Sequence, residues 1–222
     1  MRVLCSLLIA CMMTTGAIAA PDAGPAAPAP NAANNTQDPS QVVQQAAQGL
    51  LKDLESNRDA YRKDPKMLRQ LTDKHLLPYF DTEFSARLVL GRHWRDATPE
   101  QRQRFVQAFI DSLIDNYGKA VVEFTAERLK VFPSHEEPGA RNATVRTEIK
   151  RDDGSVVPVN YALHQTDQGW KAWDVVIEGI SYVKSFRDDF GAEIDQKGLD
   201  EVIQRLEAGA RPPMPATSGK KS

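Results

Sequence analysis

Cysteine is nearly absent from this sequence. Its 222 residues contain only Cys5 and Cys11, both close to the N-terminus. Residues 1–20 combine one Arg with an apolar run and end on Ala17-Ile18-Ala19, which fits the small-x-small rule for signal-peptidase cleavage. Removal of residues 1–19 would leave a mature chain without cysteine, which excludes disulfides and thiol catalysis. We therefore expect an exported protein that packing alone holds together.

Long hydrophobic runs are also missing after this segment. The apolar stretch within residues 1–20 is interrupted at Thr14-Thr15-Gly16, so it is shorter than the roughly 20 residues that a membrane-spanning helix needs. We interpret residues 1–19 as a signal peptide rather than a permanent anchor. The sequence Leu8-Ile9-Ala10-Cys11 also resembles a lipoprotein processing box, in which Cys11 would become the lipidated first residue, and this alternative stays open.

Motifs for catalysis and cofactor binding are scarce as well. The histidines His75, His93, His135 and His164 fall in different expected elements and show no metal-ligand spacing. Ser181 lacks the second glycine of a nucleophile elbow, and there is no phosphate-binding glycine loop or dinucleotide fingerprint. The formal net charge of −2 disfavours a nucleic-acid binder. We expect no catalytic residue, no metal and no cofactor.

What the chain does have is enough apolar sequence for one core. Apolar residues make up 41% and charged residues 26% of the chain. Residues 20–39 are rich in Ala and Pro and hold no apolar residue larger than Ala, so burial cannot offset the entropy of ordering them. Residues 209–222 have the same character. We predict a disordered leader at 20–39, one domain at 40–208 and a disordered tail at 209–222.

Helix starts are easy to identify. Asp38-Pro39, Asp64-Pro65 and Thr98-Pro99 each place a capping residue directly before Pro at the first helical position. Apolar residues at helical spacing follow each start, and the longest of these helices is predicted from Pro99 to about Phe124. A short helix is predicted to begin at Asp81 and to stop at Gly91. Two more helices are predicted near the C-terminus, at residues 183–194 and 199–206.

Between these helices the apolar period changes to two residues. Residues 142–151, 157–163 and 170–178 alternate in polarity and are separated by turn sequences, and a first strand is predicted at 129–133. The result is an α+β fold in which a four-stranded antiparallel sheet packs against helices from both ends of the chain. Such layers can enclose an apolar cavity or close on a solid core, and composition alone favours the solid core.

The sequence also resembles a known family. Residues 170–190, WKAWDVVIEGISYVKSFRDDF, resemble the signature of the MlaC or toluene-tolerance family, which comprises periplasmic phospholipid carriers of Gram-negative bacteria. LGRHWR at 90–95, TPEQR at 98–102, Phe105 and Tyr117-Gly118 match the same family in the same order. The resemblance covers residues 40–208.

The resemblance implies a soluble periplasmic carrier that holds the acyl chains of a phospholipid between sheet and helices. It would be a monomer that shuttles lipid between an outer-membrane lipoprotein-porin complex and the periplasmic substrate-binding subunit of an inner-membrane ABC transporter. This activity maintains outer-membrane lipid asymmetry and needs no covalent chemistry, because each buried methylene contributes about 0.8 kcal/mol.

Candidate binding residues follow from the resemblance and from the strand pattern. The resemblance places Tyr117, Val157 and Ile180 in the lipid pocket, and strand periodicity adds Val159, Tyr161, Val175 and Ile177. Basic residues that can meet a phosphate headgroup, or that are simply solvated helix charges, are Arg92, Arg95, Lys184 and Arg187.

Three alternatives remain at this point. A sister branch of the family is associated with hopanoid lipids, and the sequence does not separate the two ligands. A small cavity enzyme, such as a hydratase or isomerase, would require His164 and Asp174 to meet inside the cavity. An adaptor protein would have a solid core instead of a pocket.

Overall fold

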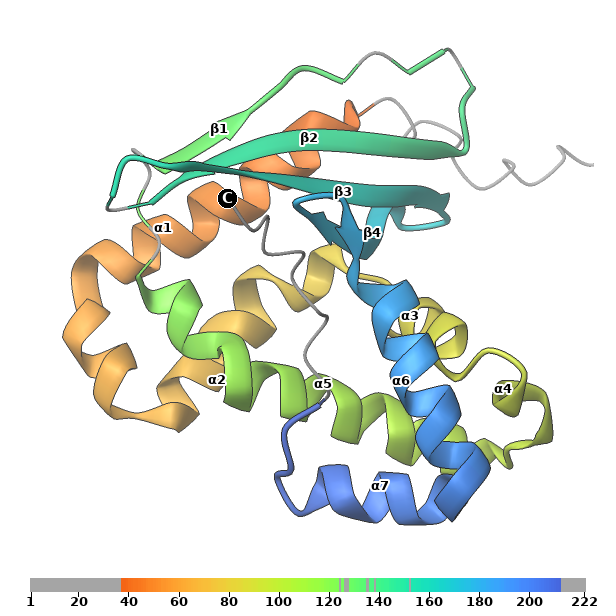
Figure 1. Ribbon diagram of the computed structural model, residues 1–222. Helices are drawn as coiled ribbons and strands as arrows, with labels where there is room; N and C mark the ends of the chain where they lie inside the picture. The colour runs from red at the N-terminus through yellow and green to blue at the C-terminus, as the bar shows by residue number, and fades with distance from the viewer. Residues whose placement is uncertain are drawn as a thin grey trace, which may run out of the picture. The chain divides into compact units, whose positions relative to one another are not determined.

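A computed structural model describes residues 37–123, 125, 128–134, 136–137, 139–151 and 153–212 (Figure 1). The predicted signal peptide and most of the predicted leader and tail lie outside the described residues. Within the described part of the chain, no helix is long and apolar enough to cross a membrane.

The predicted helix starts are confirmed. Helices α1 (Pro39–Lys63), α2 (Pro65–His75) and α5 (Pro99–Val122) each begin with Pro directly after the predicted cap. Thr98 and Gln101 form a reciprocal capping box at the start of α5. Asp81 accepts a hydrogen bond from the backbone N–H of Phe84 at 2.9 Å and so caps α3 (Thr82–Leu90). These caps depend on residues within one helical turn, which is why the sequence identifies them.

The sheet is an antiparallel meander in the predicted order. It contains β1 (Leu129–Val131), β2 (Asn142–Lys150), β3 (Val156–Thr166) and β4 (Gly169–Ile177), each hydrogen-bonded to the next. Tyr161 of β3 lies opposite Val145 on one side and Val175 on the other. Because directly opposite residues point to the same side of a sheet, these side chains share one face.

Three short elements were not predicted. A fifth strand, β5 (Ile180–Ser181), returns along β4, so the sheet has five strands rather than four. Glu178 and Gly179 both have positive φ angles, of 51° and 83°, which is the geometry of a two-residue hairpin turn. A 3₁₀ turn, η2 (Leu77–Tyr79), and the four-residue α4 (His93–Asp96) are too short to show an apolar period.

Helices from both ends of the chain cover the sheet, as predicted. Helix α1 runs along one face of it and contacts β1 and β2 (Figure 1). At the other end of the chain, α6 (Tyr182–Lys197) contacts β4, and α7 (Leu199–Glu207) packs on α5 and α6. Beyond α7 the chain follows α5, where Ser112 donates a hydrogen bond to the carbonyl of Ala210 at 3.1 Å.

A buried carboxylate joins the sheet to α6. Asp174 of β4 is 5% exposed and accepts hydrogen bonds from the Ser181 hydroxyl at 2.6 Å and from the Val183 backbone N–H at 3.0 Å. The Ser181 hydroxyl also accepts from the Lys184 N–H and caps α6. Asp174 therefore fixes the point at which α6 leaves the sheet, and its negative charge lies where the positive end of the helix dipole favours it.

The main helical core lies away from the sheet. Phe105 and Phe190 are fully buried, and their rings meet edge to face with centroids 5.7 Å apart. Phe109 and Phe186 complete this aromatic cluster between α5 and α6. A separate cluster under the sheet contains Val42 of α1 with Val145 and Leu163. The cluster that joins α3, α5, α6 and α7 is thus separate from the space between α1 and the sheet.

Candidate functional site

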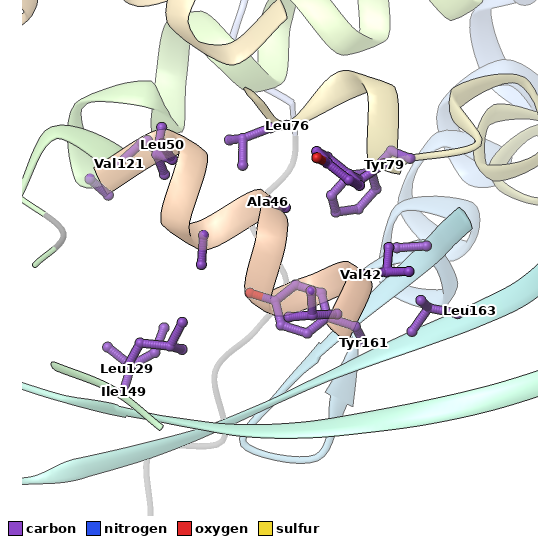
Figure 2. A pocket seen from close by; sticks show the side chains of 15 residues that line it. Val42, Ala46, Leu50, Leu76, Tyr79, Val121, Leu129, Ile149, Tyr161 and Leu163 are labelled. Carbon is purple, nitrogen blue, oxygen red and sulfur yellow. The ribbon is translucent and has the colours of Figure 1, made fainter. Parts of the chain in front are cut away.

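An apolar cavity of about 260 Å³ lies between α1 and the sheet (Figure 2). Its wall combines one face of α1, the segment after α2, the last turn of α5 and the inner face of the sheet. The residues that line it are Val42, Val43, Ala46, Ala47, Leu50, Leu76, Tyr79, Phe80, Ala120, Val121, Leu129, Ile149, Tyr161, Leu163 and Ala172. The cavity predicted between the layers is present, and the solid-core alternative is wrong for this face of the sheet.

The helical part of the wall explains why this space stays open. Val43, Ala46, Ala47 and Leu50 recur at helical spacing and face the cavity together. The two alanines in the middle of this stripe place only methyl groups opposite the sheet. A helix with larger residues there would fill the gap, because protein cores pack without voids where side chains allow it.

None of the described residues that line the cavity carries a formal charge. Its side-chain polar groups are the hydroxyls of Tyr79 and Tyr161. Burial raises the pKa of the Tyr161 hydroxyl above its ordinary value. An ionised ligand group inside this wall would lose hydration without gaining a partner. The cavity therefore suits hydrocarbon, with any charged part of the ligand left outside.

The predicted pocket residues have one member in this wall, Tyr161. Two others adjoin it by strand register: Val175 is opposite Tyr161, and Val157 is opposite Ile149, which lines the cavity. Along the same face Val159 is opposite Ile177, and Ile177 is opposite Ile180. These strand residues thus form one apolar surface that continues from the cavity toward β5.

Tyr117 comes from a different element. It lies on α5 one turn before Ala120, which lines the cavity. Desolvation raises the pKa of its hydroxyl, and nearby Arg211 opposes that shift. Tyr117 is thus close in sequence to the cavity wall without being part of it.

Sequence reasoning missed the contribution of α1. The sequence shows the apolar stripe of α1, but the predicted binding residues lie on α5, on β3 to β5 and not on α1. The available signal was the pair Ala46-Ala47 inside that stripe, since small residues between larger ones leave room for a ligand.

Of the four predicted headgroup residues, Arg92 and Arg95 lie at α4 and Lys184 and Arg187 lie on α6, and none lines the cavity. Arg92 is ion-paired with Asp195. The Arg187 side chain crosses Gly91, where an added Cβ would be 3.3 Å from its Cδ. Gly91 also has a φ of 54°, so a larger residue there is disfavoured both by this backbone angle and by the contact with Arg187. A headgroup role for Arg92, Arg95, Lys184 and Arg187 stays a prediction.

The histidine and carboxylate of the enzyme alternative do not meet. His164 Nε2 lies 2.9 Å from Asp81 Oδ2, and its ring contacts Phe84. Asp174 is engaged by Ser181 and the start of α6. Neither residue lines the cavity. In the described part of the chain, no group of three or more His, Cys, Asp or Glu side chains is placed to hold a metal ion.

Comparison with known proteins identifies relatives of this fold and sequence. The sequence model of the family described as MlaC protein matches residues 44–208. The toluene tolerance protein ttg2D of Pseudomonas putida is 34% identical over 170 residues, which cover 75% of this chain and 79% of that protein. The intermembrane phospholipid transport system binding protein MlaC of Haemophilus influenzae is 26% identical over 178 residues, covering 78% and 82%.

The fold is also similar to that of a solved structure. The phospholipid-binding protein from Ralstonia solanacearum, solved in complex with a phospholipid, superposes with a TM-score of 0.72 at 24% identity. The match covers 78% of this chain and 97% of that chain.

Proposed function

Since the chain belongs to the MlaC family, we propose that it is a soluble periplasmic carrier that binds phospholipid by its acyl chains. The observation that carries this proposal is the uncharged apolar cavity between α1 and the sheet. The Haemophilus relative is named as a phospholipid transport binding protein, and the Ralstonia protein of the same fold was solved with a phospholipid. The expected export signal at residues 1–19 agrees with a periplasmic location.

Binding of this kind needs no chemical step. Each methylene that leaves water contributes about 0.8 kcal/mol, and the lipid is released unchanged. The cavity volume is about 260 Å³, which lies just below the roughly 300–1,000 Å³ of pockets that hold drug-sized ligands. A phospholipid is larger than a drug-sized ligand, so the cavity alone is too small for a whole phospholipid. We therefore extend the proposed site along the sheet face through Val175, Ile177 and Ile180, with Val157, Val159 and Tyr117 beside it.

The proposed route connects two membranes. The carrier receives or delivers lipid at an outer-membrane lipoprotein-porin complex and at the substrate-binding subunit of an inner-membrane ABC transporter, and so maintains lipid asymmetry. A carrier that must leave both partners needs modest, partly polar interfaces. Such interfaces weaken as salt is added.

Lipid extraction tests the proposal directly. The mature protein, purified from a Gram-negative host that makes both phospholipids and hopanoids, is expected to carry phospholipid in native mass spectrometry. Recovery of hopanoid instead would favour the sister branch of the family. A protein that is empty after purification and takes up no lipid from vesicles would contradict the proposed function.

The headgroup residues give a second expected result. Replacing Lys184 and Arg187 together by Gln should slow transfer of phosphatidylglycerol about two- to fivefold more than transfer of phosphatidylethanolamine, because exposed ion pairs contribute modestly. The control is the double variant Lys63→Gln, Lys66→Gln, which also removes two positive charges but at the α1–α2 junction. Equal effects on both lipids would remove Lys184 and Arg187 from the headgroup site.

A further inference from the structure

The hydroxyl of Tyr161 is one of two hydroxyls in the described cavity wall, with that of Tyr79, that hydrocarbon binding does not explain. Tyr161 projects from β3 toward α1, and its hydroxyl points into the cavity rather than back to the strand (Figure 2). It makes no hydrogen bond with any described residue. Protein surrounds the group closely enough to desolvate it, although the cavity leaves part of the side chain accessible.

An unpaired hydroxyl in an apolar wall becomes unfavourable once a bound ligand excludes water from the cavity. Its hydrogen-bonding capacity is lost when water is excluded, whereas a phenylalanine would fill the same space without that loss. A phenol is protonated at neutral pH, and burial raises the pKa of Tyr161 further, so the group is a hydrogen-bond donor. A ligand atom that accepts this hydrogen bond would satisfy the hydroxyl.

The rest of the wall limits what that acceptor is. No Lys, Arg or His lines the cavity among the described residues, so a phosphate drawn in to this depth would have no counter-charge. Saturated acyl chains carry no acceptor. The neutral acceptor of a diacyl phospholipid is the carbonyl oxygen of its ester groups.

We infer that the Tyr161 hydroxyl donates a hydrogen bond to an acyl ester carbonyl of the bound lipid. This inference rests on the proposed function and makes it more specific: the cavity selects ester-linked over ether-linked chains, and the glycerol end of the lipid lies beside Tyr161. The position of the carbonyl then determines how far each chain reaches along the sheet face from Tyr161.

A competition between two synthetic lipids tests the inference. Diester and diether phosphatidylglycerol with the same chain length are offered together in vesicles, and the bound species are counted by native mass spectrometry. Wild-type protein is expected to prefer the diester about three- to tenfold, which is the range for one neutral hydrogen bond. Tyr161→Phe should lose this preference, and its lipid-free form should unfold at no lower denaturant concentration than wild type.

Two tyrosine variants complete the design. Tyr61→Phe removes a hydroxyl from α1 outside the cavity, in the cluster with α2 and α5, and should keep the preference. If wild type binds both lipids equally, or if Tyr79→Phe rather than Tyr161→Phe removes the preference, the assignment to Tyr161 is overturned while the carrier function stands. If wild type takes up neither lipid, the proposed function and the inference fall together.

Discussion

Replacing Ala47 by Glu is expected to remove bound lipid from a protein that still folds. Ala47 faces the cavity from the middle of the α1 stripe, opposite a wall without formal charge among its described residues. The new carboxylate would have no partner once an acyl chain excluded water, and an unpaired buried charge is unfavourable by several kcal/mol. Since about 1.4 kcal/mol is a factor of ten, lipid affinity should fall at least about a hundredfold. Quantitative lipid analysis of the purified variant measures this loss.

The neighbouring residue provides the control. Gln48 is exposed on the same helix, so Gln48→Glu adds the same charge outside the cavity and should retain lipid. Equal lipid content in Ala47→Glu and Gln48→Glu would mean that this cavity is not the binding site.

Ile180→Glu extends the test to β5. We expect it to lose lipid as well, because the proposed site continues along the sheet face to Ile180. Loss in Ala47→Glu with retention in Ile180→Glu would confine the site to the space between α1 and the sheet.

Phe190→Ala is expected to produce the largest loss of stability. Phe190 is fully buried, and its ring lies within 5.7–6.2 Å of the rings of Phe105, Phe109 and Phe186. Removal of the ring leaves a hole that the surrounding helices cannot fill, and such substitutions reduce the free energy of unfolding by about 3–5 kcal/mol. Urea denaturation of the lipid-free protein measures the change.

The same variant separates stability from binding. Because the aromatic cluster is distinct from the cavity wall, folded Phe190→Ala should still carry lipid. Phe190→Leu keeps more of the volume and should lose less stability. A Phe190→Ala protein that is as stable as wild type would contradict the packing described for α5 and α6.

The features that the sequence predicts well are those set by nearby residues. Asp38, Asp64 and Thr98 cap their own helices, and the alternation of β2 and β3 directly displays which side chains share a face. Resemblance to the family then led to the proposed carrier function. Strand alternation places Tyr161 on the apolar face that lines the cavity, and its role in binding stays a prediction.

The rest depends on contacts between distant segments. Which helix lies opposite Tyr161 is a tertiary property, so the pair Ala46-Ala47 indicates room for a ligand beside α1 but not which strands face it. Similarly, Glu178-Gly179 is not one of the strongest hairpin sequences, so the return of the chain as β5 was missed. His164 and Asp174 were considered as a pair, whereas the fold gives each a separate partner.

The shortness of β1 and β5 has a consequence for how this protein meets other chains. The outermost strands have three and two residues, so each edge of the sheet exposes little backbone for another chain to pair with. Next to β1, the Glu136 side chain accepts a hydrogen bond from the Thr144 backbone N–H. Next to β5, the carbonyls of Ala172 and Trp173 accept from Asp81 and Ser85. Strand addition, which produces long-lived complexes and fibrils, therefore has only a short and partly occupied template along the described edges of this sheet. We expect this protein to remain free of self-association at the high local concentrations of a crowded compartment, and to recognise partners through side chains that separate readily.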